Sequence, residues 1–124
     1  MKQVLLVVAG GGLGAAARYL LSGAVQRHAG TLFPYGTLAV NTLGCLAIGV
    51  LMSMFEDRFL MQPSLRLFLT VGVLGGFTTF SSFSYETIEL LRAGSVLAGM
   101  MNIAASLLCC LAGTWLGLAA GKLL

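Results

Sequence analysis

The sequence concentrates hydroxyl and aromatic side chains in one run, residues 72–87. Within it, Phe80 and Phe83 are three residues apart and therefore share one face of a helix. Ser81 and Ser84 place hydroxyl donors on neighbouring faces. The edge of an aromatic ring carries positive charge and attracts an anion without trapping it, so the pattern is typical of an anion path. The competing interpretation is that the two rings only pack in an apolar helix.

The same run contains a candidate break in a helix. Gly75 and Gly76 precede Thr78 and Thr79 in the middle of an apolar stretch, and this order favours a broken helix near Gly75–Thr79. If the stretch crosses a bilayer, unwound backbone is tolerated only inside protein or beside a water-filled cavity. Carbonyl groups freed at the break could hold a cation such as Na⁺. The alternative is a continuous helix that is merely loosened by glycine.

Three more polar side chains interrupt apolar stretches: Arg18, Asn41 and Glu86. An amide at membrane depth needs a partner, and Asn41 could either donate to an anion or join two helices. Arg18 and Glu86 are unfavourable against lipid, so we expect them to face a water-filled vestibule, an ion path or each other. A purely structural ion pair is the competing interpretation of these two residues.

The composition defines the elements that must position these residues. A chain of 124 residues that is 58% hydrophobic and 9% charged has almost nothing to place on a water-facing surface. The first two apolar stretches cover about 4–25 and 38–55, and two more begin near Leu65 and Val96. Each is long enough to cross a bilayer. We therefore expect an all-α membrane protein with about four transmembrane helices, the third one broken, in a single domain, residues 1–124.

The charges exclude one class of partner and bear on orientation. The formal net charge is +3, but the cations form no basic face, so nucleic acid is excluded. The four-span interpretation places a larger group of cations on one side of the membrane than on the other: Lys2, Arg58, Arg66 and Lys122 against Arg27 and Arg92. So small a bias permits insertion in both directions, and hence an antiparallel pair of copies. A single orientation is the alternative.

Cysteines and small residues are interpreted as packing elements. The odd number of cysteines (Cys45, Cys109 and Cys110) and their lack of metal-ligand spacing argue against both a disulfide framework and a metal site. The fourth helix has small residues at every fourth position, which predicts a face that another helix approaches closely. That predicted face consists of Ala105, Cys109, Gly113, Gly117 and Gly121.

Two motifs together resemble a known family. The segment Gly36-Thr37-Leu-x-Val-Asn41 precedes the run Gly-Gly-Phe-Thr-Thr-Phe-Ser-Ser-Phe-Ser-x-Glu at 75–86. Both are similar to motifs of the Fluc, or CrcB, family of fluoride channels, and they occur in the family's order. The resemblance spans the whole chain, including a glycine-rich first helix that carries Arg18.

The resemblance implies a passive fluoride channel in a plasma membrane, the inner membrane of a bacterium. It implies a dual-topology homodimer of two antiparallel subunits, with two fluoride pores along their interface. Phe80 and Phe83 would be the ring pair beside each pore, and Asn41 a pore-lining donor. The backbone carbonyls of Gly75 and Thr78 would hold a structural Na⁺ at the dimer interface.

Further pore residues follow from the same resemblance. Arg18 would lie near a vestibule that collects anions electrostatically. The polar lining of the pore would be completed by Thr37, Ser81, Ser82, Ser84, Glu86, Ser106 and Thr114. One departure concerns Cys110, which stands where the family commonly has a pore-facing serine. Because a thiol is a weak hydrogen-bond donor, this position is not expected to help fluoride as a serine would.

Two other functions are alternatives to a channel. A small proton-coupled multidrug exporter is also a short dual-topology bundle, but it needs a carboxylate in its first helix, where this chain offers Arg18. A non-conducting accessory subunit of a larger complex is the second alternative. An enzyme is not expected, because no nucleophile, base and orienting group occur together in a recognisable pattern.

Overall fold

The computed structural model describes residues 1–57 and 62–124, and in these ranges all regular structure is helical. Four helical segments are long and apolar enough to cross a membrane: Lys2–Ala29, Tyr35–Glu56, Pro63–Arg92 and Val96–Gly121. The predicted all-α fold with four membrane-spanning helices is thereby confirmed. Arg58, one of the cations in the predicted charge bias, lies outside the described residues.

The first two spans are α1 (Lys2–Ala29) and α2 (Tyr35–Asp57). α1 ends at Gly30, whose φ of 61° is a left-handed conformation that glycine adopts without strain. The side chain of Gln26 stabilises the connection between α1 and α2 by hydrogen bonds. Its Nε2 donates to the carbonyls of Thr31 and Phe33, at 2.7 and 3.0 Å, and its Oε1 accepts from the next helix. The loop backbone thus finds partners within the protein.

The third span is built from four helical pieces. These are α3 (Pro63–Leu67), the π-helical η1 (Phe68–Leu74), α4 (Gly75–Phe77) and α5 (Phe80–Arg92). Only Thr78 and Thr79 leave the helix, with ψ of 156° and 114°, so the break lies at the threonines. Gly76 is helical, and it serves packing: a Cβ there would overlap the Gly11 carbonyl of α1.

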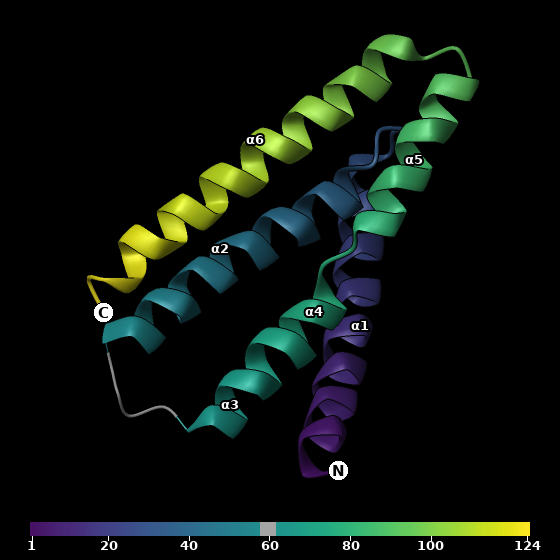
Figure 1. The fold of residues 1–124 in the computed structure, drawn as a ribbon. Coiled ribbons are helices and arrows are strands. Elements are labelled where there is room, and N and C mark those ends of the chain that lie inside the picture. The colour runs from purple at the N-terminus through teal and green to yellow at the C-terminus, as the bar shows by residue number, and fades with distance from the viewer. Residues whose placement is uncertain (58–61) are drawn as a thin grey trace.

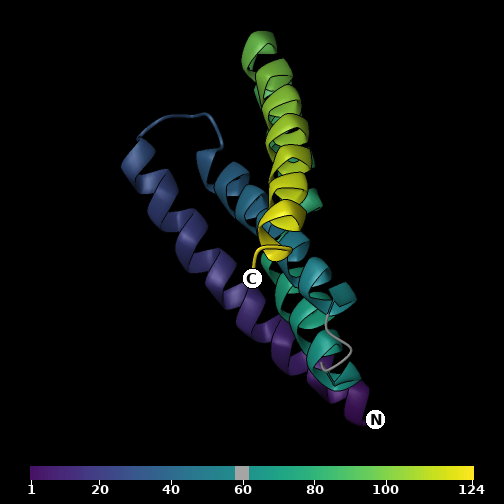
Figure 2. The ribbon, with the colours of Figure 1, turned by 90° about the vertical axis from the view of Figure 1, so that its left-hand side faces the viewer.

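Two tightly packed helix pairs make up the subunit. α1 lies along α3, η1 and α4, and α2 lies along α6 (Val96–Gly121), as both ribbon views show (Figures 1 and 2). Glycines allow the close approach in each pair. A Cβ on Gly14 would overlap the Val73 carbonyl, and a Cβ on Gly117 would overlap the Leu46 carbonyl.

The predicted small face of α6 is correct at its C-terminal end and wrong at Cys109. Gly113, Gly117 and Gly121 are buried, whereas Cys109 is exposed. The buried face continues instead through Ser106 and Asn102. The reason is helical phase: residues repeating every fourth position drift around a helix of 3.6 residues per turn, so the stripe leaves the contact face after two turns.

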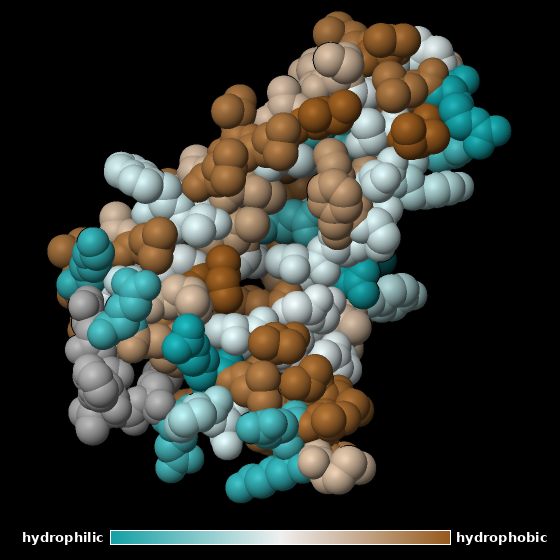
Figure 3. All heavy atoms as spheres, in the orientation of Figure 1, coloured by the Kyte–Doolittle hydropathy of each residue, from teal (hydrophilic) through white to brown (hydrophobic). Residues whose placement is uncertain are grey.

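The subunit has its apolar residues outside and its small and polar residues inside. Among the described residues, Val40 is the one fully buried large hydrophobic side chain, while Thr37, Ser53, Thr87 and Asn102 are buried polar ones. Leucines, methionines and Trp115 cover the outside. Hydrophobic side chains spread over α6, and hydrophilic ones gather both at the end that carries the termini and at the opposite end, beside the α5–α6 connection (Figure 3). This distribution is that of a protein surrounded by lipid.

Candidate functional site

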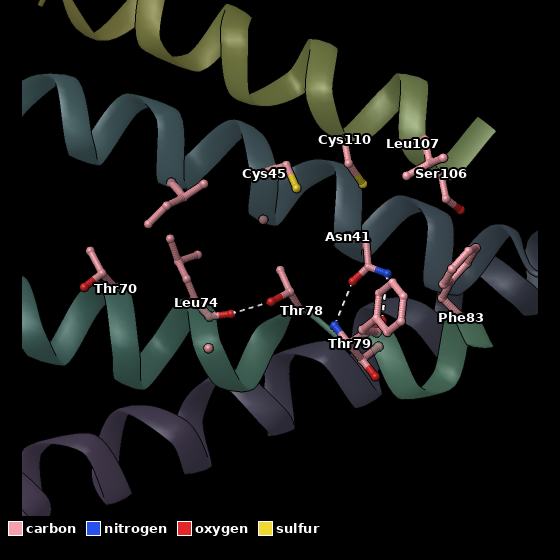
Figure 4. A pocket seen from close by; sticks show the side chains of 14 residues that line it. Asn41, Cys45, Thr70, Leu74, Thr78, Thr79, Phe83, Ser106, Leu107 and Cys110 are labelled. Atoms are coloured by element: carbon pink, nitrogen blue, oxygen red, sulfur yellow. Dashed lines mark hydrogen bonds between the residues drawn. The ribbon is translucent and has the colours of Figure 1, made fainter. Parts of the chain in front are cut away.

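Asn41 of α2 holds the break in the third span. Its Oδ1 accepts a hydrogen bond from the Thr79 backbone N–H at 2.7 Å, and its Nδ2 donates to the Thr79 carbonyl at 2.9 Å. Figure 4 shows the amide reaching across to this residue. One side chain therefore replaces both of the backbone partners that Thr79 loses by leaving the helix, which matters in a medium without competing water.

The break also removes the helical hydrogen-bond partners of several carbonyl groups, including those of Gly75 and Thr78. In a continuous helix, the Thr79 N–H would donate to Gly75 and the Ser82 N–H to Thr78. Instead, Thr79 donates to Asn41, and Ser82 donates to the Thr79 hydroxyl at 3.2 Å, which caps α5. The Gly75 and Thr78 carbonyl oxygens are thus released from helical pairing, and their chemistry fits a hard cation.

A cleft of about 400 Å³, here called the ring cleft, opens beside the break. Six predicted site residues line it: Asn41, Gly75, Thr78, Phe80, Phe83 and Ser106. The ring centroids of the two phenylalanines are 5.3 Å apart, and their planes are tilted by 55°. Phe83 is half-buried, whereas Phe80 is 77% exposed in the isolated subunit. Of the residues that the structure describes, no charged one lines this cleft.

A second cleft of about 240 Å³, here called the arginine cleft, lies between α1, α2 and α5. It is lined by Arg18, Thr37, Ser82 and Glu86, all predicted as site residues. The Thr37 hydroxyl donates to Glu86 Oε1 at 2.7 Å, while Glu86 Oε2 is buried and has no hydrogen-bond partner among the described residues. A further cleft of about 290 Å³ under the α1–α2 connection shares Thr37 and Glu86 with it.

Arg18 does not pair with Glu86, although both line the arginine cleft. Its Nε donates to the Gly76 carbonyl at 3.1 Å, close to the C-terminal end of α4. A cation there complements the negative end of a helix. In the part of the chain that the structure describes, the one ion pair is the exposed Arg92–Glu89 contact at 3.4 Å. A structural Arg18–Glu86 ion pair, weighed from the sequence, is therefore not formed.

The structure separates the predicted pore residues into those that line one of these two clefts and those that line neither. Thr79, whose backbone is hydrogen-bonded to Asn41, lines both the ring cleft and the arginine cleft and so lies between them. Ser81, Ser84 and Thr114 line neither cleft. The two serines are exposed, whereas Thr114 is half-buried on the α2 side of α6.

Sequence reasoning missed one buried pair. Asn102 of α6 donates to the Thr87 hydroxyl at 2.9 Å, and this hydroxyl donates to the Phe83 carbonyl at 2.7 Å. The chain of bonds fixes α6 against α5 one turn from the rings. An asparagine within an otherwise apolar helix was the available indication, because such a side chain needs a partner.

Comparison with known proteins agrees with the two motifs. The family model described as CrcB-like protein, Camphor Resistance (CrcB), matches residues 5–118. A "Fluoride-specific ion channel FluC" from Geobacter sulfurreducens is 48% identical over 122 residues, covering 98% of each chain. One of the same name from Pelobacter propionicus is 50% identical over 127 residues, covering 100% of this chain and 96% of its own.

These names describe ion channels, so the family is one of transporters rather than enzymes, as the sequence predicted. The match extends over nearly the whole chain, and the four apolar helices make the protein a multi-pass membrane protein. The resemblance inferred from the motifs is confirmed. The chain belongs to the CrcB family.

Proposed function

We propose that the protein is a passive, fluoride-selective channel that lets toxic fluoride leave the cell. The observation that carries the proposal is the ring cleft, in which Phe80, Phe83 and Asn41 come together beside a helix break. Relatives that match the whole chain are named fluoride-specific channels, which supports the same ion. Hydrofluoric acid enters cells as a neutral molecule and dissociates in the less acidic cytoplasm, so a leak down the gradient needs no energy source.

The ring cleft offers fluoride weak partners and no strong one. The Asn41 amide carries two N–H groups, and only one donates to Thr79, so the second can face the anion. Ser106 contributes a hydroxyl, and the two phenylalanine rings contribute their positive edges. Because no cationic side chain in the described ranges lines this cleft, the ion would be attracted without being trapped, which conduction requires.

The arginine cleft would serve as the vestibule in this proposal. Arg18 donates to the Gly76 carbonyl through its Nε, so the other N–H groups of the guanidinium remain available to attract anions. Thr37 and Glu86 form the floor of the same space. The partition between this cleft and the ring cleft is the Asn41–Thr79 contact, which fluoride would have to pass.

The conducting unit in this proposal is an antiparallel homodimer with two pores, situated in the bacterial inner membrane. In the isolated subunit, Phe80 is 77% exposed and the ring cleft is open on one side, so a second copy could close it. The weak bias of cations between the two sides supports dual topology.

A structural Na⁺ at the centre of this dimer fits the residues present. The carbonyl oxygens of Gly75 and Thr78 are released from helical hydrogen bonds by Asn41 and by the Thr79 cap. Carbonyls of an unwound segment are suitable ligands for Na⁺. The ion would stabilise the break by balancing the dipoles that meet there.

The test is fluoride efflux from liposomes that contain only the purified protein. A fluoride electrode records the efflux, and parallel liposomes loaded with chloride report selectivity. Rapid fluoride efflux without a proton gradient or ATP is the expected result. An inert dimer would instead support the accessory-subunit alternative, and efflux that depends on a proton gradient would support the exporter.

A further inference from the structure

Two cysteines face each other at the edge of the ring cleft. Cys45 lies on α2 and Cys110 on α6, and both line the cleft (Figure 4). The sulfur atoms of both side chains lie in the space between the two helices (Figure 4). The close approach of the two helices brings these side chains together: a Cβ on Gly113 would lie 3.7 Å from that of Cys45.

The ligand set of this pair selects a narrow class of ion. Among the described residues, no group of three His, Cys, Asp or Glu side chains is close enough to hold a metal, so a tetrahedral zinc site is excluded. Two thiolates suit a soft monovalent cation that accepts two ligands. On binding, two S–H bonds break and two metal–sulfur bonds form, while two protons pass to water. The bis-thiolate complex of a monovalent cation carries a net charge of −1.

We propose that Cys45 and Cys110 form a binding site for Cu(I) or Ag(I) between α2 and α6, and that occupation of this site closes the ring cleft to fluoride. The second part rests on the proposed channel function. Asn41 and Phe83 line the same cleft, so a fixed negative charge beside them repels an anion in a medium of low dielectric constant. In this proposal, Cys110 has a function that the serine commonly found at this position in the family could not supply.

The binding test uses Ag⁺ and the chain's own control. Cys109 is exposed on the outer side of α6, so Cys109→Ser removes the unrelated thiol. Purified C109S protein is titrated with silver nitrate in weakly buffered, chloride-free solution near pH 6. The expected result is two protons released per bound Ag⁺ and saturation at one Ag⁺ per chain. Release of one proton per Ag⁺, or no saturable binding, would overturn the site.

The functional test measures fluoride efflux with and without Ag⁺, each variant being compared with its own silver-free rate. Ag⁺ should slow efflux of C109S by about tenfold or more, and should leave C45S/C109S and C109S/C110S unaffected. If one of these cysteine-to-serine variants is not monodisperse after purification, the corresponding cysteine-to-alanine variant is used in its place. Equal inhibition of all variants would refute the closing of the cleft. If C109S carries no fluoride even without Ag⁺, the channel function and the closing fail together, while proton release still decides the metal site.

Discussion

At the scale of single residues, Asn41 decides the geometry of the break. It pairs with both backbone groups of a residue 38 positions away in the sequence and so redirects the N–H that would close the helix onto Gly75. An amide can do this because it is donor and acceptor at once. The same residue lines the ring cleft. In the proposed channel, one side chain would therefore both support the backbone and contact the permeating ion.

Replacing Asn41 with alanine should therefore affect stability as well as transport. Both Thr79 backbone groups lose their partner, which should lower the free energy of unfolding by about 1–3 kcal/mol. Fluoride efflux should fall in parallel. Unfolding in mixed detergent measures the first effect. Gln3→Ala removes an exposed amide that lines none of the three clefts, so it is the matched control and should leave both quantities unchanged.

The two rings should control the rate of transport without holding the subunit together. Phe80→Leu and Phe83→Leu each remove a ring edge from the cleft, and we expect fluoride efflux to fall about tenfold or more, or about 1.4 kcal/mol in the barrier. Size-exclusion profiles should be unchanged. Tyr85→Leu on the same helix is the control, because Tyr85 is 68% exposed and does not line the cleft. An equal loss in this control would remove the rings from the path.

At the scale of elements, the third span divides its tasks between glycines and threonines. Gly72 and Gly76 pack against the backbone of α1, while Thr78 and Thr79 provide the extended residues and the cap of α5. Glycines of α1 and α6 likewise allow close packing, against the third span and against α2 respectively. Close helix packing in lipid depends on such contacts, because no hydrophobic effect drives helices together there.

Two glycines of α1 give a matched test of this packing. A Cβ on Gly14 would overlap the Val73 carbonyl, whereas a Cβ on Gly12 would meet nothing within 4 Å. Gly14→Ala should therefore destabilise the fold by about 1–3 kcal/mol. Gly12→Ala should be neutral or slightly stabilising, because alanine favours helix. Thermal unfolding in detergent compares the two, and equal effects would contradict the role assigned to the glycine face.

At the scale of the whole molecule, the isolated subunit would be an incomplete wall for the proposed channel. Its ring cleft is open, Phe80 is exposed, and the interior holds small and polar residues rather than an apolar core. Four spans put both termini on one side of the membrane, where they also lie in the ribbon (Figure 1). An antiparallel partner would present the same surfaces in reverse.

Dual topology predicts that the N-terminus is found on both sides of the membrane. Lys2→Cys in a chain whose three native cysteines are replaced by serine gives one reporter thiol. An impermeant maleimide added outside sealed vesicles should label about half of the chains, because the bias of cations is weak. Complete labelling, or none, before the vesicles are opened would show a single orientation and remove the antiparallel dimer.

The sequence alone determined the class of protein, the four spans, the polar run and the family, because these depend on composition, local hydropathy and motif order. It also located the break to within a few residues. It could not show that Asn41 meets Thr79, that Arg18 turns to Gly76 rather than to Glu86, or that Cys110 and not Cys109 faces the cleft.

These features depend on helical phase and on which helices are neighbours, and both are decided by packing. A one-position difference such as that between Cys109 and Cys110 rotates a side chain by about 100° around the helix axis, and this separates lipid from cleft. Contacts between distant segments form only when glycine surfaces bring the helices together. Local chemistry was therefore visible in the sequence, while the partners of each polar group were fixed by the tertiary structure.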